Sequence, residues 1–300
     1  SGGLDSTLAL IVAVEAFNIN GYDKKGIHAI TMPCYGTTDR TLNNARRLME
    51  ILEVTSYEIN IKDACEQHYK DIGYDKSKLD VTFENVQARE RTQILMDVSN
   101  KIGSLVVGTG DLSELALGWC TYNGDQMSMY GVNASIPKTL VRGILESYAE
   151  HHEGLKDVLL DICDTPVSPE LLPPNEDGTI KQKTEDKIGS YVVHDFILYY
   201  MLTHGFGPKK IFDLYVNAKI MHEKNIGVKE PVVDKQELLN NMDIFYNRFW
   251  TQQFKRSCMP DGVKVGSVSL SPRGDWRMAS DACQGIWLDE LKDLKEKYCK

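Results

Sequence analysis

The sequence predicts an α/β fold, in which a parallel sheet flanked by helices is followed by a helical C-terminal portion. Short β-rich runs occur at 28–33, 56–61 and 104–108, and they alternate with helical patterns at 6–18, 39–53 and 84–101. This alternation is typical of βαβ units and a parallel sheet. From Pro137 onward the patterns are helical, at 138–151, 190–203, 208–221 and 234–249. We therefore expect one unit over 1–300, with an α/β core at 1–150 and a mostly helical extension at 151–300.

Composition excludes several classes of protein. The 300 residues are 42% hydrophobic and 26% charged, which is ordinary for a globular chain. No apolar run of about 18 residues is present, so we expect no membrane span. The net charge of −9 disfavours a nucleic-acid partner. The seven cysteines never occur as CxxC, which favours reduced thiols and a cytoplasmic location over structural zinc.

The N-terminal loop carries the strongest local signal. Ser1-Gly2-Gly3-Leu4-Asp5-Ser6 leads directly into an apolar helical stretch. Two glycines allow the backbone to turn its N–H groups inward, and the helix adds its positive N-terminal end, so the loop is suited to phosphate oxygens. Asp5 could hold a divalent metal bound to those phosphates, although a simple glycine-rich helix start is the alternative. A loop of this kind normally follows a buried strand, so we expect the sequence to be an internal fragment.

Further motifs extend along the chain. They are ENVQARER at 84–91, GTGDLSE at 108–114, WCTYNGD at 119–125, PKT at 137–139, QFKRS at 253–257 and SPRGDWR at 271–277. With the N-terminal loop, they resemble the synthetase domain of glutamine-dependent NAD synthetases, in the ATP-pyrophosphatase superfamily. The resemblance covers nearly the whole chain and implies a Rossmann-like sheet of the adenine nucleotide alpha hydrolase type.

The resemblance implies a ligase that uses ATP and Mg²⁺ to amidate deamido-NAD through an adenylated intermediate, releasing AMP and pyrophosphate. The family's long enzymes carry an upstream glutaminase domain that has no counterpart in this sequence. We therefore expect ammonia to be supplied directly or by such a domain in the parent chain. Family members also form dimers or larger homo-oligomers.

Residues matching the family's ATP site are distributed over both halves. The catalytic and metal-binding candidates are Asp5 and Glu114, with Lys138 as a third catalytic candidate. The resemblance implies that ATP is contacted by Ser1, Gly2, Gly3, Asp5, Ser6, Ile30, Met32, Thr109, Lys138 and Ser168. Ile30 and Met32 would offer backbone groups to adenine, although both also suit a plain buried strand.

Residues matching the acceptor site lie mainly between 85 and 125. Asn85 and Arg89 are four residues apart on a predicted helix and therefore share a face, whereas Arg91 points elsewhere. The resemblance implies that deamido-NAD is bound by Asn85, Arg89, Glu114, Trp119, Cys120, Thr121, Tyr122, Asp125 and Lys255. Trp119 and Tyr122 could stack on the nicotinate ring, or they could form an aromatic plug under a loop. The histidines show no metal-ligand spacing, and we assign none to catalysis.

Three alternatives remain open at this stage. Another ATP-pyrophosphatase amidotransferase, similar to GMP synthetase, would share the N-terminal loop but lack GWCTYNGD and QFKRS. Enzymes that thiolate tRNA fit poorly with the acidic charge and the cysteine spacing. A non-catalytic nucleotide-binding module would be expected to have lost Asp5 or Glu114, and both are present.

Overall fold

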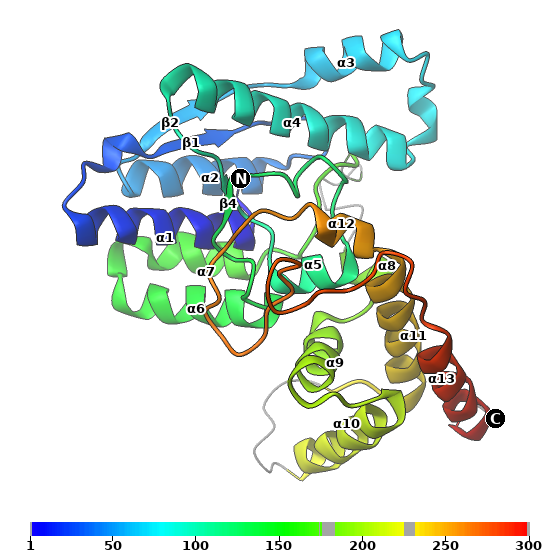
Figure 1. Cartoon of the computed structure of the whole chain (residues 1–300). Helices are drawn as coiled ribbons and strands as arrows, with labels where there is room; N and C mark the ends of the chain where they lie inside the picture. The colour runs from blue at the N-terminus through cyan, green and yellow to red at the C-terminus, as the bar shows by residue number, and fades with distance from the viewer. Residues whose placement is uncertain (1, 174, 176–183, 225–231, 299–300) are drawn as a thin grey trace.

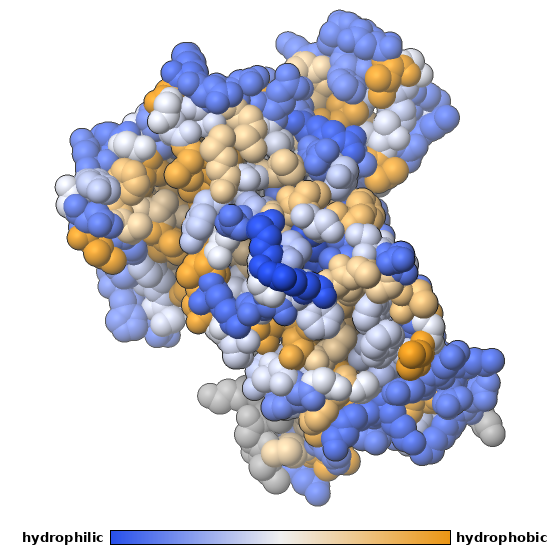
Figure 2. Space-filling model, in the orientation of Figure 1, coloured by the Kyte–Doolittle hydropathy of each residue, from blue (hydrophilic) through white to orange (hydrophobic). Residues whose placement is uncertain are grey.

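The computed structural model describes residues 2–173, 175, 184–224 and 232–298 (Figure 1). The strands and the early helices lie on one side of the molecule, and the C-terminal helices form a lobe at the lower right of the view. The surface of α13 in this lobe is largely hydrophilic (Figure 2), in keeping with the acidic, charged composition.

The strands pair in parallel, as the βαβ pattern predicts. β1 (His28–Thr31) pairs with β2 (Thr55–Glu58), His28 opposite Thr55. β3 (Val107–Gly108) pairs with β4 (Tyr130–Gly131), Val107 opposite Tyr130. Within the described residues, β1 and β3 are not hydrogen-bonded to each other, so the expected sheet occurs as two parallel pairs. Residues of both β1 and β3 line one cavity.

The predicted helices are present with small shifts at their ends. Those of the first half are α1 (Leu4–Asn20), α2 (Asp39–Ile51), α4 (Val81–Ile102) and α6 (Lys138–His151). Those of the second half are α9 (Tyr191–His204), α10 (Pro208–Glu223) and α11 (Lys235–Thr251). Local chemistry explains several ends: the Thr38 side chain caps α2, and Gly21 ends α1 in a left-handed conformation with φ of 68°.

Six further α-helices that the sequence patterns did not predict are present among the described residues. They are α3 (Lys62–Asp71), α5 (Leu112–Leu117), α7 (Lys156–Cys163), α8 (Thr184–Ile188), α12 (Gln253–Ser257) and α13 (Gly285–Tyr298). Five of them span ten residues or fewer, so each shows at most about three turns of periodicity. None of the helices described is long and apolar enough to cross a membrane.

Two large apolar clusters support the region between them. One joins α1, α2, α6 and α7 through residues such as Leu8, Leu48, Leu145 and Leu159. The other joins α5, α9, α10, α11 and α13 and includes Leu117, Ile197, Phe245 and Leu291. Because α6 contacts α1, α5 and α9, its first turn lies where elements of both clusters meet. This junction positions the polar residues described next.

Candidate active site

One cavity of about 1370 Å³ collects nearly all of the predicted site residues. Its wall includes the start of α1, β1, α4, the segment after β3, the loop 119–125 and the loop 165–171. Every predicted site residue lines it except Ser1, which lies outside the described residues, and Lys138. The sequence motifs, although far apart in the chain, therefore share a single binding space.

The N-terminal end of α1 opens on this cavity. Gly2 is buried against α2, and a Cβ atom at this position would lie 2.3 Å from the carbonyl oxygen of Thr41, so only glycine fits. Gly3 is the N-cap, and the Ser6 hydroxyl donates a hydrogen bond to its carbonyl oxygen at 3.1 Å. Because the first turn of a helix directs N–H groups outward, this end of α1 is suited to an anionic ligand.

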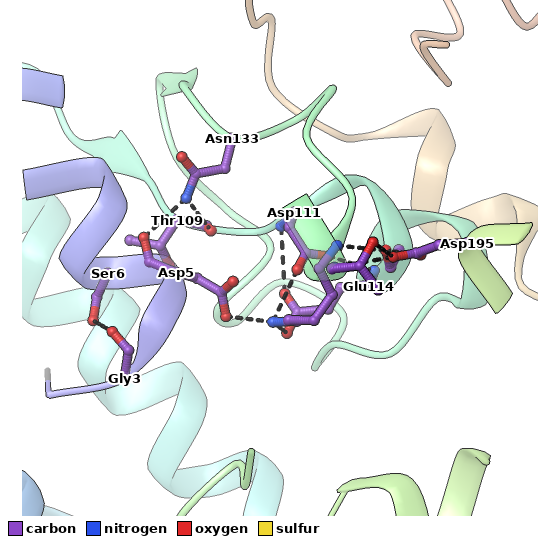
Figure 3. A network of polar contacts seen from close by, with 11 residues as sticks. Gly3, Asp5, Ser6, Thr109, Asp111, Glu114, Asn133 and Asp195 are labelled. Carbon is purple, nitrogen blue, oxygen red and sulfur yellow. Dashed lines mark hydrogen bonds and ion pairs between the residues drawn. The ribbon is translucent and has the colours of Figure 1, made fainter. Parts of the chain in front are cut away.

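Three carboxylates gather beside this helix end (Figure 3). Asp5 is in the first turn of α1, while Asp111 and Glu114 form a capping box at the start of α5. Asp111 Oδ1 accepts a hydrogen bond from the Glu114 N–H at 2.8 Å. The three side chains offer oxygens that all lie within 4.8 Å of one another. A capping box and a helix first turn therefore bring three carboxyl groups together.

The side chain of Lys138 ends among these carboxylates. Its Nζ lies 2.5 Å from Asp5 Oδ2, 2.9 Å from Glu114 Oε1 and 2.9 Å from Asp111 Oδ2. The Lys138 side chain is only 4% exposed, and its ammonium lies behind the cavity wall. Its predicted direct contact with ATP stays a prediction, because in this structure its nearest partners are the carboxylates.

Burial and charge perturb the titration of this cluster. Burial raises the pKa of Asp111 and raises the pKa of Glu114 to about 7, although the nearby Lys138 ammonium opposes both effects. Burial alone would lower the pKa of Lys138, but the three carboxylates raise it well above its ordinary value. Lys138 is therefore a cation at neutral pH, and its charge favours the ionised forms of the carboxylates around it.

The cluster fits a divalent cation with hard oxygen ligands. Carboxylate oxygens are the ligands that Mg²⁺ prefers. Asp5 Oδ1 is buried and has no hydrogen-bond partner among the residues that the structure describes. Asp111 Oδ2 is near the Lys138 ammonium but is not aligned for a hydrogen bond with it. Two acceptor oxygens are thus held in place with unused capacity.

Asp111 and Asn133 are site residues that the sequence analysis did not select. The pattern Asp111-Leu-Ser-Glu114 is itself a capping-box signal, and it could have identified Asp111. Asn133 is completely buried, and its Nδ2 donates to the carbonyl oxygens of Asp5 at 2.9 Å and Thr109 at 3.0 Å. Asn133 thereby ties the N-terminal end of α1 to the segment after β3.

Asn85 and Arg89 of α4 both contact the loop 119–125. Asn85 Oδ1 accepts a hydrogen bond from the Thr121 hydroxyl at 2.8 Å. The Arg89 Nε donates to the Tyr122 carbonyl oxygen at 3.2 Å, and Asp125 Oδ1 accepts from the Thr121 N–H at 2.7 Å. The expected shared face of α4 is confirmed, and Arg91 turns instead toward the Met32 carbonyl oxygen at 3.2 Å.

Cations from the C-terminal half hold the other end of this loop. Lys255 Nζ donates to the carbonyl oxygens of Gly118 at 2.8 Å and Cys120 at 2.7 Å. Arg248 donates to the Leu117 carbonyl oxygen at 2.9 Å, and its guanidinium carbon lies 5.2 Å from the centre of the Trp119 ring. Because cations at a helix C-terminus stabilise its carbonyl groups, these side chains fix the end of α5.

The remaining predicted residues lie around the same cavity. Ile30 and Met32 are in and just after β1, and Ser168 Oγ accepts a hydrogen bond from the Glu170 N–H at 3.1 Å. The Tyr122 ring is 5.4 Å from that of Phe254. Trp119 and Tyr122 thus pack on different neighbours: Trp119 on Arg248, and Tyr122 on Phe254.

Comparison with known sequences identifies the family. The sequence profile described as NAD synthase matches residues 1–224. The chain belongs to the NAD synthase family. It is 45% identical over 311 residues to the glutamine-dependent NAD(+) synthetase of Mycobacterium leprae, covering 97% of this chain and 45% of that protein. The Mycobacterium tuberculosis enzyme of the same name is 43% identical over 307 residues, with the same coverage. The chain thus spans about half the length of these relatives.

Solved structures from the NAD synthase family share the fold. The glutamine-dependent NAD(+) synthetase from Cytophaga hutchinsonii matches with a TM-score of 0.76 at 18% identity, over 98% of this chain and 51% of that one. The NH₃-dependent NAD synthetase from Campylobacter jejuni matches with a TM-score of 0.53 at 23% identity, over 87% and 85% of the two chains. The α/β fold expected from the sequence is confirmed.

Proposed function

We propose that this chain amidates the nicotinate carboxylate of deamido-NAD, consuming ATP and releasing NAD, AMP and pyrophosphate. One observation carries the proposal: a carboxylate cluster at the N-terminal end of α1 opens on the same cavity as the loop 119–125. The first feature suits a metal-bound triphosphate, and the second offers aromatic and polar groups to a second ligand. Membership in the NAD synthase family supports deamido-NAD as that ligand.

The reaction requires activation because ammonia cannot expel an oxide from a carboxylate. A nicotinate carboxylate oxygen attacks the α-phosphorus of ATP, and the bond to the β-phosphate oxygen breaks as pyrophosphate leaves. Ammonia then attacks the carbonyl carbon of the resulting mixed anhydride. The C–O bond breaks, AMP leaves with the bridging oxygen, and the nitrogen loses a proton to give the carboxamide.

The N-terminal end of α1 binds the pyrophosphate portion of ATP in this proposal. Gly2, Gly3 and Ser6 provide the turn and the donors at this end. Asp5, Asp111 and Glu114 would hold Mg²⁺, which neutralises phosphate charge and favours departure of pyrophosphate. Lys138 keeps the three carboxylates together when their mutual repulsion would separate them.

The loop 119–125 binds the acceptor. Trp119 and Tyr122 provide aromatic surfaces for the nicotinate ring, and Arg89 provides a guanidinium group for the dinucleotide pyrophosphate. Lys255 contributes positive charge at the base of the loop. Proximity and charge stabilisation account for catalysis in this scheme, and no covalent enzyme intermediate is required.

Ammonia is the nitrogen donor of this chain. The curated relatives are named glutamine-dependent, and the chain spans about half of their length. We propose that ammonia enters either from solution or from a glutaminase domain of a longer protein. We also propose a homodimer or larger homo-oligomer in the cytoplasm, which light scattering would test.

The proposal is tested by supplying ATP, Mg²⁺, ammonium chloride and deamido-NAD and measuring NAD, AMP and pyrophosphate. We expect the three products in equal amounts, with pyrophosphate release dependent on deamido-NAD. The Asp5→Asn variant should be inactive but folded. Asp157→Asn is a matched control, because Asp157 is 83% exposed and pairs only at 3.7 Å with Arg47. A folded wild-type chain that releases no pyrophosphate with deamido-NAD would exclude the proposed function.

A further inference from the structure

The carboxylate of Asp195 joins the two helices that carry the charged cluster. Asp195 is on α9, outside the cavity wall formed by the described residues. Its Oδ1 accepts a hydrogen bond from the Ser113 hydroxyl of α5. Its Oδ2 accepts from the N–H of Thr139 at 3.0 Å and from the Thr139 hydroxyl at 2.7 Å, both at the start of α6. One side chain therefore fixes α5 and α6 relative to each other (Figure 3).

The same contacts cap α6. The helix begins at Lys138 after Pro137, and proline has no side-chain acceptor for the first N–H groups. The Ser113 hydroxyl accepts from the Lys138 N–H at 2.9 Å, and Asp195 accepts from the next N–H. The start of α6 is thus capped by side chains from two other helices.

These contacts lie directly behind the ion pairs of the cluster. Ser113 is between Asp111 and Glu114 in the chain, and Lys138 precedes Thr139. Asp195 therefore holds the Ser113 side chain, between the two carboxylates, and the backbone N–H of Thr139, next to the residue that carries the ammonium. The distances of 2.9 Å from Lys138 Nζ to Asp111 and to Glu114 depend on this relative placement.

We propose that Asp195 is a positioning residue for the carboxylate cluster, acting through Ser113 and Thr139 rather than by touching substrate. The inference rests on the proposed function for its kinetic consequence only. An Asn side chain has the same shape but carries an NH₂ group in place of one acceptor oxygen. If its oxygen accepts from Thr139, its NH₂ group faces the Ser113 hydroxyl, which loses its acceptor, so the contact between α9 and α5 is weakened.

The test compares Asp195→Asn with Asp161→Asn in the full chain. Asp161 also ties two helices, accepting from Arg40 at 2.7 Å and Asn44 at 2.5 Å, but neither partner belongs to the carboxylate cluster. We expect Asp195→Asn to lower kcat by roughly 10- to 100-fold, because small misplacements of reacting groups have large effects. KM for ATP should change less than kcat, and Asp161→Asn should leave kcat unchanged.

A second readout is independent of activity. In the ¹⁵N-lysine NMR spectrum, the buried Lys138 ammonium should give a slowly exchanging signal, assigned by its loss in Lys138→Arg. We expect Asp195→Asn to broaden or shift this signal and Asp161→Asn to leave it in place. If Asp195→Asn does not fold, Ser113→Ala and Thr139→Ala serve instead. Each removes one of the hydrogen-bonding partners of Asp195, and each should change the ammonium signal in the same direction but by less.

The two proposals fail in different ways. Absence of NAD formation by the wild-type chain excludes the proposed function, while the ammonium signal still tests the role of Asp195. An unchanged ammonium signal in Asp195→Asn would overturn the positioning role. So would an unchanged kcat in an active enzyme, even if the variant were less stable than the wild type.

Discussion

Lys138 Nζ lies 2.5 Å from Asp5 Oδ2, and this ion pair joins the first turn of α6 to the first turn of α1 across 133 positions of the chain. The pair places a buried cation at the N-terminal end of α1. It also connects that end to the two carboxylates of α5. Lys138 therefore links the first turns of α1 and α6 to the start of α5, and we expect both stability and the proposed activity to depend on it.

Replacing Lys138 by Met should destabilise the fold at neutral pH. Three carboxylates would lose their buried counter-charge, and loss of one partner from a buried ion pair costs about 3–5 kcal/mol. The carboxylates raise the folded-state pKa of Lys138, so its stabilising contribution is present below its ordinary pKa and is lost only at more alkaline pH.

The destabilisation should be smaller at lower pH. Without Lys138, protons bound by the clustered carboxylates reduce their repulsion as the pH falls from 8 to about 5.5. Urea denaturation of both proteins across this range measures the difference. An equal loss of unfolding free energy at every pH would show that charge is not the cause.

His194 should make the fold sensitive to acid. Its Nε2 donates to the Ile188 carbonyl oxygen at 2.6 Å, and burial lowers its pKa from 6.5 to about 4. The unfolded chain therefore binds the proton more readily between these values, and stability falls as the pH decreases through this window. The contribution lost by pH 5 is about 2 kcal/mol. His194→Gln keeps a donor and should lack this part of the pH dependence; a parallel profile for both proteins would refute the assignment.

Arg256 should contribute far more stability than a surface arginine. It is 1% exposed and donates to the carbonyl oxygens of Leu115 at 3.2 Å and Ala116 at 2.7 Å. Replacement by Ala leaves buried carbonyl groups unpaired and creates a cavity, at a cost of about 3–5 kcal/mol. Arg46→Ala is the control, since its ion pair with Glu58 is solvent-exposed and should contribute little stability. Similar unfolding midpoints for the two variants would contradict this ranking.

Arg89→Ala should weaken binding of deamido-NAD but not of ATP. The guanidinium of Arg89 is anchored through Nε to the Tyr122 carbonyl oxygen, at the acceptor side of the cavity. Loss of a hydrogen bond to a charged group costs about 1.5–3 kcal/mol, so KM for deamido-NAD should rise at least roughly tenfold. Arg47→Ala serves as the control, since Arg47 is 55% exposed on α2. If only the KM for ATP rose, Arg89 would lie on the ATP side of the cavity, and the proposed placement of the two substrates would be wrong.

Local patterns predicted those parts of the molecule that depend on neighbouring residues. The βαβ spacing predicted parallel strands, and the Gly2-Gly3 turn predicted an open helix end beside Asp5. Even Asp111 could be inferred, because a capping box is a pattern four residues long. Short elements such as β4, with two residues, gave too little periodicity to predict.

The site residues that the sequence did not reveal act through contacts between distant parts of the chain. Asn133 acts on Asp5 over 128 positions, and Asp195 acts on Ser113 over 82. Neither residue differs in type or spacing from an ordinary surface Asn or Asp. Lys138 was selected through its motif, but only the fold shows that its ammonium contacts three carboxylates.

The central claim, that the carboxylate of deamido-NAD is adenylated, is tested most directly by following its oxygen atoms into the products. Deamido-NAD labelled with ¹⁸O in both carboxylate oxygens is converted by the chain with ATP, Mg²⁺ and ammonium, and the products are analysed by mass spectrometry. Attack of the carboxylate on the α-phosphorus predicts one ¹⁸O atom in AMP, one in the carboxamide of NAD and none in pyrophosphate. Unlabelled AMP, or label in pyrophosphate or orthophosphate, would contradict the adenylated intermediate and the account built on it.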